Sequence, residues 1–300
     1  MDIKKELPGV KENVLLKNHT TFRIGGKAKY FFVAKDKEDI INAVSIAKKL
    51  KLPFFVLGGG SNTLVSDRGF EGLVIKIQNS RLRHSGFGGQ AKLKTIYAEA
   101  GTSLGQLVNV ALKNSLTGME WATGIPGTIG GAIYGNAGAF GESIGDVVKK
   151  VEVLDTKDLR FKIYDLKKCK FGYRDSIFKH KKNLIILSAK IQLKKGKKSE
   201  IKRKIKEFLD YRQETQPLNF PSAGSVFINP PGFFAGKLIE DCGLTGKKIG
   251  KAKISEKHAN FILNLGGSKA KDVKKLIKLI KQKVKKKFGV KLEEEIQYLF

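Results

Sequence analysis

Three consecutive glycines, Gly58, Gly59 and Gly60, precede Ser61 and Asn62 at the end of the apolar run PFFVL. Glycine has no side chain to pack and loses much conformational entropy on folding, so three in a row indicate backbone that bends sharply or approaches another group closely. Because no Cβ stands in the way, the N–H groups of such a turn can converge on a phosphate oxygen. The spacing fits neither a Walker loop nor G-x-G-x-x-G, so a plain tight turn is the alternative interpretation.

A second glycine-rich stretch, TGIPGTIGGAIYGNAGAFG, covers residues 123–141. Its glycines recur three residues apart in two runs, and small residues surround Pro126. Such a stretch lets the backbone lie against a large, extended ligand, although close packing of two elements through small residues is the alternative. Two glycine-rich segments of different design in one α/β unit favour a dinucleotide-sized ligand over a mononucleotide.

The residue types that bind metals or form disulfides are few and scattered. Cys169 and Cys242 stand far apart, and the four histidines are not spaced as ligand pairs. This distribution fits a reducing compartment and argues against a disulfide framework or a zinc site. We therefore predict no bound metal, although residues distant in sequence can still converge in the fold.

The first glycine turn is positioned by elements that read as strand, helix, strand over residues 29–60. Ile40, Val44 and Ala47 recur at helical spacing, and PFFVL then resumes as a buried strand. The middle of the chain shows alternating patterns typical of antiparallel strands. By these patterns we predict strands at 72–77, 92–101, 147–155, 159–166, 183–193, 259–266 and 290–300, and helices at 103–116, 200–213, 233–243 and 269–291.

Size and charge set broader limits. A chain of 300 residues should form two or three compact units with sizeable cores. The net charge of +30 indicates an anionic partner but does not distinguish nucleic acid, a membrane surface and small phosphorylated ligands. The lysines of the helix at 269–291 lie opposite an apolar face and are interpreted as a solvated surface. Because no signal-peptide core and no apolar run of about 18–20 residues is present, we expect a soluble, cytoplasmic protein without membrane insertion.

Seven motifs occur in the order HTTFRIGGKA, LGGGSNTLVSDRGFEGLVI, GMEWATGIPGTIGGAIYGNAGAFG, FGYRDSIFK, PSAGSVFINP, LIEDCGLTGKKIGKAKISEKHANFILN and GVKLEEEI. In this order they resemble the UDP-N-acetylenolpyruvoylglucosamine reductases, flavoenzymes of peptidoglycan precursor synthesis. The resemblance covers about residues 15–297. The short segment between FGYRDSIFK and LIILSA lacks the inserted tyrosine-bearing loop of one subtype, so the chain resembles the second subtype.

The resemblance implies a mixed α/β and α+β fold. An FAD-binding domain of the PCMH/vanillyl-alcohol-oxidase type would comprise two subdomains, residues 1–76 and 77–196. A smaller C-terminal α/β substrate-binding domain would cover residues 197–292, and a closing strand over 293–300 would carry a catalytic glutamate.

The activity implied is that of a UDP-N-acetylmuramate dehydrogenase. With NADPH as hydride donor and bound FAD, it would reduce the enolpyruvyl ether of UDP-N-acetylglucosamine to the lactyl ether of UDP-N-acetylmuramate. This oxidoreductase would serve cell-wall biogenesis, and through it cell shape, the cell cycle and cell division. The expected partner is a UDP-sugar substrate, with no nucleic acid, and a monomer is favoured.

In that family the flavin diphosphate lies on the first glycine turn and on the long glycine stretch. The resemblance therefore unites the two stretches in one expectation, a pyrophosphate cradle for FAD. The expected cofactor contacts are Gly58, Gly59, Gly60, Ser61, Asn62, Thr123, Gly124, Pro126, Gly127, Gly130, Gly131, Asn136, Ala137 and Gly138.

The resemblance also implies three catalytic residues. Hydride addition at the terminal alkene carbon pushes negative charge toward the adjacent carboxylate, which Arg174 would bind. The alternative interpretation of Arg174 is a surface ion pair with Asp175. The enolate carbon then needs a proton, and Ser225 would supply it as general acid, although a turn serine looks the same in sequence. Glu295, aligned with the second glutamate of Leu-Glu-Pro-Glu-Val, would help stabilise the enol intermediate, either protonated or as an ion.

The chain departs from the family pattern at two positions. Glu294 replaces the usual proline, and alternation along a strand would send its side chain to the face opposite Glu295. Ile228 stands where many relatives carry lysine, and Lys237 could compensate. Tyr211 and Arg212 are candidate diphosphate contacts or an ordinary helix end.

Two other functions compete with this interpretation. Another flavoenzyme of the same fold would use both glycine stretches but would have no reason to carry Arg174, Ser225 and Glu295 together. A nucleic-acid-binding module would explain the charge, yet the basic residues do not interleave with aromatic stacking platforms, and the glycine stretches would stay unexplained.

Overall fold

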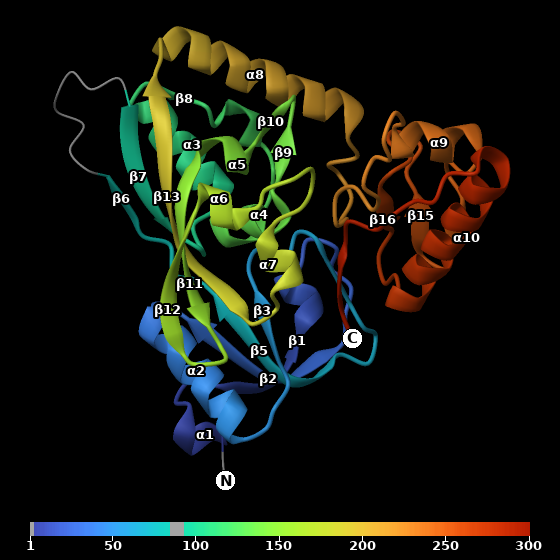
Figure 1. Ribbon diagram of the computed structural model, residues 1–300. Coiled ribbons are helices and arrows are strands. Elements are labelled where there is room, and N and C mark those ends of the chain that lie inside the picture. The colour runs from blue at the N-terminus through green and yellow to red at the C-terminus, as the bar shows by residue number, and fades with distance from the viewer. Residues whose placement is uncertain (1–2, 85–92) are drawn as a thin grey trace. The chain divides into compact units, whose positions relative to one another are not determined.

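The computed structural model describes residues 3–84 and 93–300 (Figure 1), so position 92 of one predicted strand lies outside the described residues. The chain divides into two compact units. Unit 1 comprises Met1–Val10, Phe32–Gly59 and Val74–Tyr211, and unit 2 comprises Lys11–Phe31, Gly60–Leu73 and Arg212–Phe300. The predicted domain boundaries remain a prediction.

The strand–helix–strand arrangement before the first glycine turn is confirmed. Strand β2 (Lys27–Ala34) leads into α2 (Lys37–Lys49), and β3 (Phe54–Leu57) ends directly before Gly58. The side chain of Asp36 caps α2 by accepting a hydrogen bond from the backbone, as an N-cap aspartate does. The helix buries the apolar face that its spacing predicted.

The antiparallel strands predicted for the middle of the chain form one sheet of unit 1, with the order β12-β11-β13-β7-β6 and β8 paired to β13. β13 is the long central strand, and its register shifts against β11 mark bulges. These strands are β6 (Leu82–His84), β7 (Leu93–Glu99), β8 (Leu116–Thr117), β11 (Val148–Asp155), β12 (Arg160–Asp165) and β13 (Leu184–Lys195).

Helices complete unit 1. The predicted helix at 103–116 is observed as α3 (Leu104–Lys113), which Ser103 and Gln106 close with a capping box. The helix predicted at 200–213 is α8 (Lys198–Thr215), two residues longer at each end. The remaining elements are short: α1 (Ile3–Glu6), η2 (Glu120–Ala122), α4 (Ile129–Gly135), β9 (Gly138–Ala139), β10 (Glu142–Ser143), α5 (Ile144–Val147), α6 (Leu166–Cys169) and α7 (Ile177–His180).

The C-terminal part of unit 2 packs two helices against a small antiparallel sheet of order β14-β15-β16. The lysine-rich helix α10 (Ala270–Phe288) ends at Gly289, which is left-handed, and α9 (Ala235–Asp241) ends before Gly243. The apolar face of α10 is buried, whereas its lysines lie on the outside, as predicted. The strands are β14 (Lys248–Ile249), β15 (Ala252–Ile254) and β16 (Ile262–Asn264).

The rest of unit 2 includes a two-stranded parallel pair of β4 and β17. A four-stranded sheet, with strands from both stretches of the chain before and after the first glycine turn, has the order β1-β2-β5-β3. The elements not yet bounded are β1 (Lys11–Leu15), η1 (Leu16–His19), β4 (Thr63–Val65), β5 (Phe70–Ile77) and β17 (Gln297–Leu299). Within residues 3–84 and 93–300, no helix combines the length and apolar character needed to cross a bilayer.

The closing strand is shorter than predicted. β17 covers only Gln297–Leu299, so Glu295 precedes the strand instead of lying within it. The segment before β17 pairs with the neighbouring backbone at a single bridge, Phe227 with Glu294. The neighbouring segment continues with Pro230, which has no N–H to donate, so the ladder cannot extend to the start of the predicted strand.

Candidate functional site

The two glycine-rich stretches meet within unit 1. A Cβ on Gly59 would lie 3.0 Å from the Cα of Gly127, and a Cβ on Gly58 would lie 2.7 Å from Oγ1 of Thr128. Gly127 has a φ of +142°, a conformation that side chains rarely adopt. The surface built from these residues is therefore bare backbone, which any Cβ would fill.

Two polar groups beside this backbone surface were not predicted. Lys76 donates a hydrogen bond from its ammonium group to the carbonyl oxygen of Gly58, and burial lowers the pKa of Lys76. The backbone of Thr102 accepts a hydrogen bond from Ile129, while its buried hydroxyl has no partner among the described residues. Sequence periodicity gave no signal for either residue, since both are single polar residues within or beside β-strands.

Other predicted residues of the second glycine stretch pack against neighbouring segments of unit 1. Gly124 also has a positive φ, of +71°, and a Cβ on Gly130 would lie 2.9 Å from the Cβ of Ala100. Asn136 ends α4 in the left-handed conformation, and its side-chain amide binds backbone on both sides, at Gly172 (2.7 Å) and Gly145 (3.0 Å). The side chain of Asn136 thus holds neighbouring loops together.

The other predicted cofactor contacts are backbone positions beside these. Thr123 ends η2 and is buried, and Pro126 lies in the loop before α4. The N–H of Gly131 donates to the hydroxyl of Thr128 at the start of α4. The N–H of Ala137 donates to the carbonyl oxygen of Ala132 in the same helix.

Arg174 lies at the tip of a tight turn in unit 1. Gly172 and Asp175 exchange two backbone hydrogen bonds of 3.0 and 3.1 Å, which closes the turn around Tyr173 and Arg174. Arg174 has a φ of +53°, an uncommon conformation for a residue other than glycine and one found often at functional sites. Its guanidinium donates a hydrogen bond of 2.7 Å to the carbonyl oxygen of Gly138, so the arginine lies against the second glycine stretch.

Asp175, the alternative ion-pair partner considered for Arg174, has another contact. The carboxylate of Asp175 contacts Nε2 of His180 at 2.9 and 3.0 Å. Asp175 is thus paired with His180, and the guanidinium of Arg174 is anchored on the second glycine stretch.

Unit 2 brings together the other two predicted catalytic residues. The amide of Glu295 donates a hydrogen bond of 2.8 Å to the carbonyl oxygen of Val226, the residue after Ser225. Asn260 supports the same segment: its side-chain amide accepts from the N–H of Phe227 at 2.9 Å and donates to its carbonyl at 2.8 Å. Ser225 and Glu295 therefore lie on adjacent backbone segments, both part-exposed.

The end of the first glycine turn reaches this place through Asn62. The side-chain nitrogen of Asn62 donates a hydrogen bond of 3.0 Å to the backbone carbonyl oxygen of Glu295. The backbone carbonyl oxygen of Asn62 accepts a hydrogen bond from the N–H of Gln297. The Oδ1 atom of Asn62 is buried and has no partner among the described residues. Gly60, two residues earlier, has a φ of +68°, and a Cβ there would lie 2.2 Å from the carbonyl of His19. Ser61 accepts a long hydrogen bond from Thr21 at its carbonyl.

The residues at which the chain departs from the family pattern also have defined surroundings. Glu294 accepts hydrogen bonds from Lys281 and Tyr298. The amide of Ile228 pairs with Glu293 at 2.9 Å, and Lys237 forms an ion pair with Asp241 along α9. That Lys237 replaces a lost phosphate contact remains a prediction.

The two candidates near the end of α8 also differ in their surroundings. Tyr211 is exposed and makes an edge contact with Phe140, whereas Arg212 is buried. Their predicted contact with a diphosphate remains a prediction.

An FAD molecule fits the chemistry of these residues. Bare backbone at Gly58, Gly59 and Gly127 allows close approach of a pyrophosphate, and the buried hydroxyl of Thr102, which has no partner among the described residues, can accept or donate a further hydrogen bond. Lys76 adds a positive charge beside the turn when it is protonated. These residues would hold the cofactor.

Comparisons with known proteins agree with this arrangement. A family model described as "FAD binding domain" matches residues 28–159, and one described as "UDP-N-acetylenolpyruvoylglucosamine reductase, C-terminal domain" matches residues 216–299. Among curated proteins, the chain is 49% identical over 285 residues to the UDP-N-acetylenolpyruvoylglucosamine reductase of Caldanaerobacter subterraneus, covering 95% of this chain and 92% of that protein. It is 45% identical to that of Caldicellulosiruptor bescii, covering 95% and 88%.

A solved structure gives the same result. The crystal structure of UDP-N-acetylenolpyruvylglucosamine reductase from Thermus caldophilus superposes with a TM-score of 0.80 at 35% identity, covering 96% of this chain and 98% of that one. The predicted fold class, a mixed fold with an FAD-binding domain and a smaller C-terminal α/β domain, is confirmed.

Proposed function

Because the chain belongs to the UDP-N-acetylenolpyruvoylglucosamine reductase family, we propose that it reduces the enolpyruvyl ether of UDP-N-acetylglucosamine to UDP-N-acetylmuramate, with NADPH as donor and FAD as bound cofactor. The reaction is a step of peptidoglycan precursor synthesis. The observation that carries the proposal is the pairing of the Ser225 and Glu295 backbone segments, because an enolate-forming reduction needs a proton donor and a carboxyl group in one site.

When bound, FAD would supply the hydride transfer that carries reducing equivalents from NADPH to the terminal carbon of the enolpyruvyl double bond. Gly58, Gly59 and Gly127 would bind its pyrophosphate through backbone N–H groups, and Lys76 would add electrostatic attraction when protonated. The bare backbone surface supports this assignment, since a side chain at these positions would occupy the space that phosphate oxygens need.

Arg174 binds the carboxylate of the substrate. As the terminal carbon gains a hydride, negative charge develops at the adjacent carbon and its carboxylate, and a fixed guanidinium stabilises that charge more than the ground state. The hydrogen bond from Arg174 to Gly138 and its left-handed backbone support a preorganised guanidinium.

Ser225 and Glu295 complete the reaction on the other carbon. The Ser225 hydroxyl donates a proton to the basic enolate carbon, and the neighbouring Glu295 stabilises the enol oxygen and orients the donor. The hydrogen bond between Glu295 and Val226 supports this pairing, because it holds the two residues on adjacent segments. The enzyme works in the cytoplasm on its UDP-sugar substrate and is active as a monomer.

Product analysis tests this function. Purified protein is incubated with FAD, NADPH and enolpyruvyl-UDP-N-acetylglucosamine, and the nucleotide sugar is analysed by mass spectrometry. We expect a product heavier by two hydrogens that coelutes with UDP-N-acetylmuramate, formed in equal amount to NADP. Consumption of NADPH with no change in the sugar would assign the chain to another flavoenzyme activity.

A further inference from the structure

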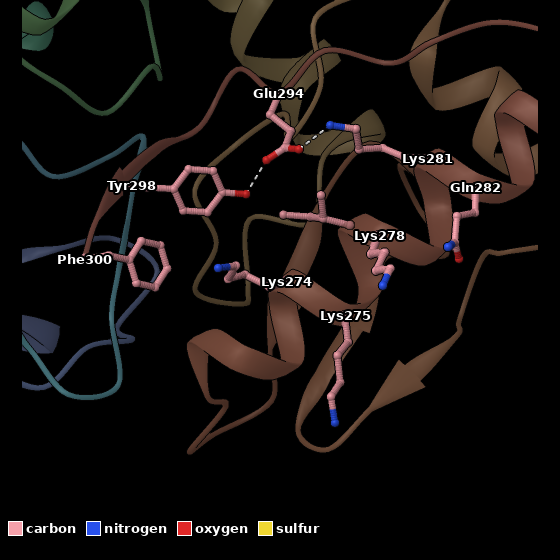
Figure 2. Close-up of a pocket in the computed structure, with 9 residues that line it drawn as sticks. Lys274, Lys275, Lys278, Lys281, Gln282, Glu294, Tyr298 and Phe300 are labelled. Atoms are coloured by element: carbon pink, nitrogen blue, oxygen red, sulfur yellow. Dashed lines mark hydrogen bonds and ion pairs between the residues drawn. The ribbon is translucent and has the colours of Figure 1, made fainter.

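Glu294, the residue before Glu295, contacts two elements, α10 and β17, through its carboxylate. Lys281 on α10 donates to one oxygen at 2.6 Å, and the hydroxyl of Tyr298 on β17 donates to the other. Figure 2 shows both contacts converging on the carboxylate. The side chains of Lys281 and Glu294 are 37% and 21% exposed, so the ion pair is partly shielded from water. Burial, and then the hydrogen bond to Glu294, raise the pKa of Tyr298, which therefore stays a donor.

The backbone on either side of Glu294 is tied to the Ser225 segment. Ile228 donates to the carbonyl of Glu293 at 2.9 Å, and Glu295 donates to the carbonyl of Val226 at 2.8 Å. This pattern makes Glu294 a non-hydrogen-bonded position, whose own N–H is not used by the pairing. Because side chains alternate along extended backbone, Glu294 and Glu295 project from opposite faces.

We propose that Glu294 is a positioning residue for Glu295, and this inference rests on the proposed function. The bonds from Lys281 and Tyr298 fix the side chain on one face, and they thereby fix the backbone rotation that sets the direction of Glu295 on the other. They act on this segment together with the bridge between Phe227 and Glu294 and with the hydrogen bonds that the Glu295 carbonyl accepts from Asn62 and Gln297.

Charge in the surrounding pocket strengthens this dependence. A pocket of about 640 Å³ is lined by Lys274, Lys275, Lys278 and Lys281, and Glu294 is the acidic residue among its described lining residues. Removal of the carboxylate would leave Lys281 facing like charges without compensation. The lysine would then leave the site, and the tie to α10 would be lost.

Two substitutions of Glu294, by alanine and by proline, separate the loss of the carboxylate from the loss of backbone order. Alanine removes the carboxylate and leaves a flexible residue. Proline also removes the carboxylate, but it restricts the backbone and costs no ladder hydrogen bond at this position. We expect E294A to lower kcat by about 10- to 100-fold with little change in KM, because small misplacements of a catalytic group cost rates of this order. E294P should recover kcat to within about threefold of wild type, less than 1 kcal/mol in barrier.

Lys281 provides the second arm, with Lys278 as matched control, since both line the pocket one turn apart on α10. We expect K281M to lower kcat in the wild-type background but to have no effect in E294P, and K278M to be silent in both. Equal loss of kcat in E294A and E294P, or an equal effect of K281M in both backgrounds, would overturn the inference.

Amide hydrogen exchange makes the test independent of turnover. The N–H of Glu295 is bonded to Val226, so its exchange reports the order of the segment. We expect faster exchange of a peptide covering 293–297 in E294A and wild-type exchange in E294P; equal exchange in all three proteins would contradict the proposal. If wild-type protein forms no UDP-N-acetylmuramate, the proposed function fails, whereas active wild type with fully active E294A refutes the positioning role alone.

Discussion

The side-chain amide of Asn62 donates a hydrogen bond of 3.0 Å to the backbone carbonyl of Glu295, 233 residues further along the chain. One residue thus ends the first glycine turn and holds the segment of the predicted catalytic glutamate. This contact links a residue expected to bind the cofactor with a residue expected to act on the substrate.

Asn62→Ala should therefore lower kcat through Glu295. The loss of one hydrogen bond of about 1 kcal/mol predicts a decrease in kcat of about fivefold, with folding retained because the backbone bond from Gln297 to residue 62 persists. Steady-state kinetics measure the decrease in kcat, and the thermal midpoint of unfolding shows whether folding is retained. The kinetics are measured at saturating FAD, so that kcat reports on the Glu295 segment; unchanged kcat in N62A would contradict the coupling.

Gly59→Ala should weaken retention of FAD. The added Cβ would lie 3.0 Å from the Cα of Gly127, so the two glycine stretches would have to separate. We expect at least tenfold weaker binding of FAD to the apoprotein, about 1.4 kcal/mol, measured by flavin fluorescence titration. Gly105→Ala is the control, because a Cβ there meets nothing within 4 Å; binding equal to that of this control would argue against the cradle.

Asp155 should make folding stability depend on pH. Lys162, then the amide of Lys157 and the side chain of Asn183 stabilise its carboxylate, and they hold the pKa of Asp155 below its ordinary value of 3.8. A depressed folded pKa contributes stability above the unfolded pKa, and this contribution is lost as pH falls below it.

Asp155→Asn should accordingly lower Tm by about 2–4 °C at pH 7, and the difference from wild type should shrink below about pH 4. Thermal scans at several pH values test this. Asp210→Asn removes an exposed pair with Lys206 and should change Tm little at any pH. A D155N deficit that persists undiminished at low pH would show that its cause is not ionisation.

Local elements followed from the sequence because their causes are local. The apolar spacing of Ile40 and Val44 predicts the buried face of α2, and Gly243 follows the end of α9 because glycine accepts the left-handed conformation. The helix predicted at 269–291 ends earlier, at Phe288, because Gly289 takes the left-handed conformation. The glycine turn after β3 was readable for the same reason, since backbone sterics act within a few residues.

Contacts between distant segments were not readable. Nothing in the pattern LEEEI distinguishes Glu294, bound to Lys281 and Tyr298, from Glu295, bound through its backbone to Val226 and Asn62. The closing strand was predicted too long because its alternation continues beyond the point where Pro230 ends the pairing. The family motifs predicted the candidate catalytic residues, whereas their contacts with distant segments became visible only in the structure.

The most direct test of the central claim is an anaerobic absorbance trace of the flavin band in wild type and in Ser225→Ala. Excess apoprotein is reconstituted with FAD, one equivalent of NADPH is added, and enolpyruvyl-UDP-N-acetylglucosamine follows. In wild type the band should disappear with NADPH and return with substrate; in S225A it should disappear equally fast and fail to return, because no proton reaches the enolate carbon. Return of the band in S225A at the wild-type rate, or no return in wild type, would contradict the account.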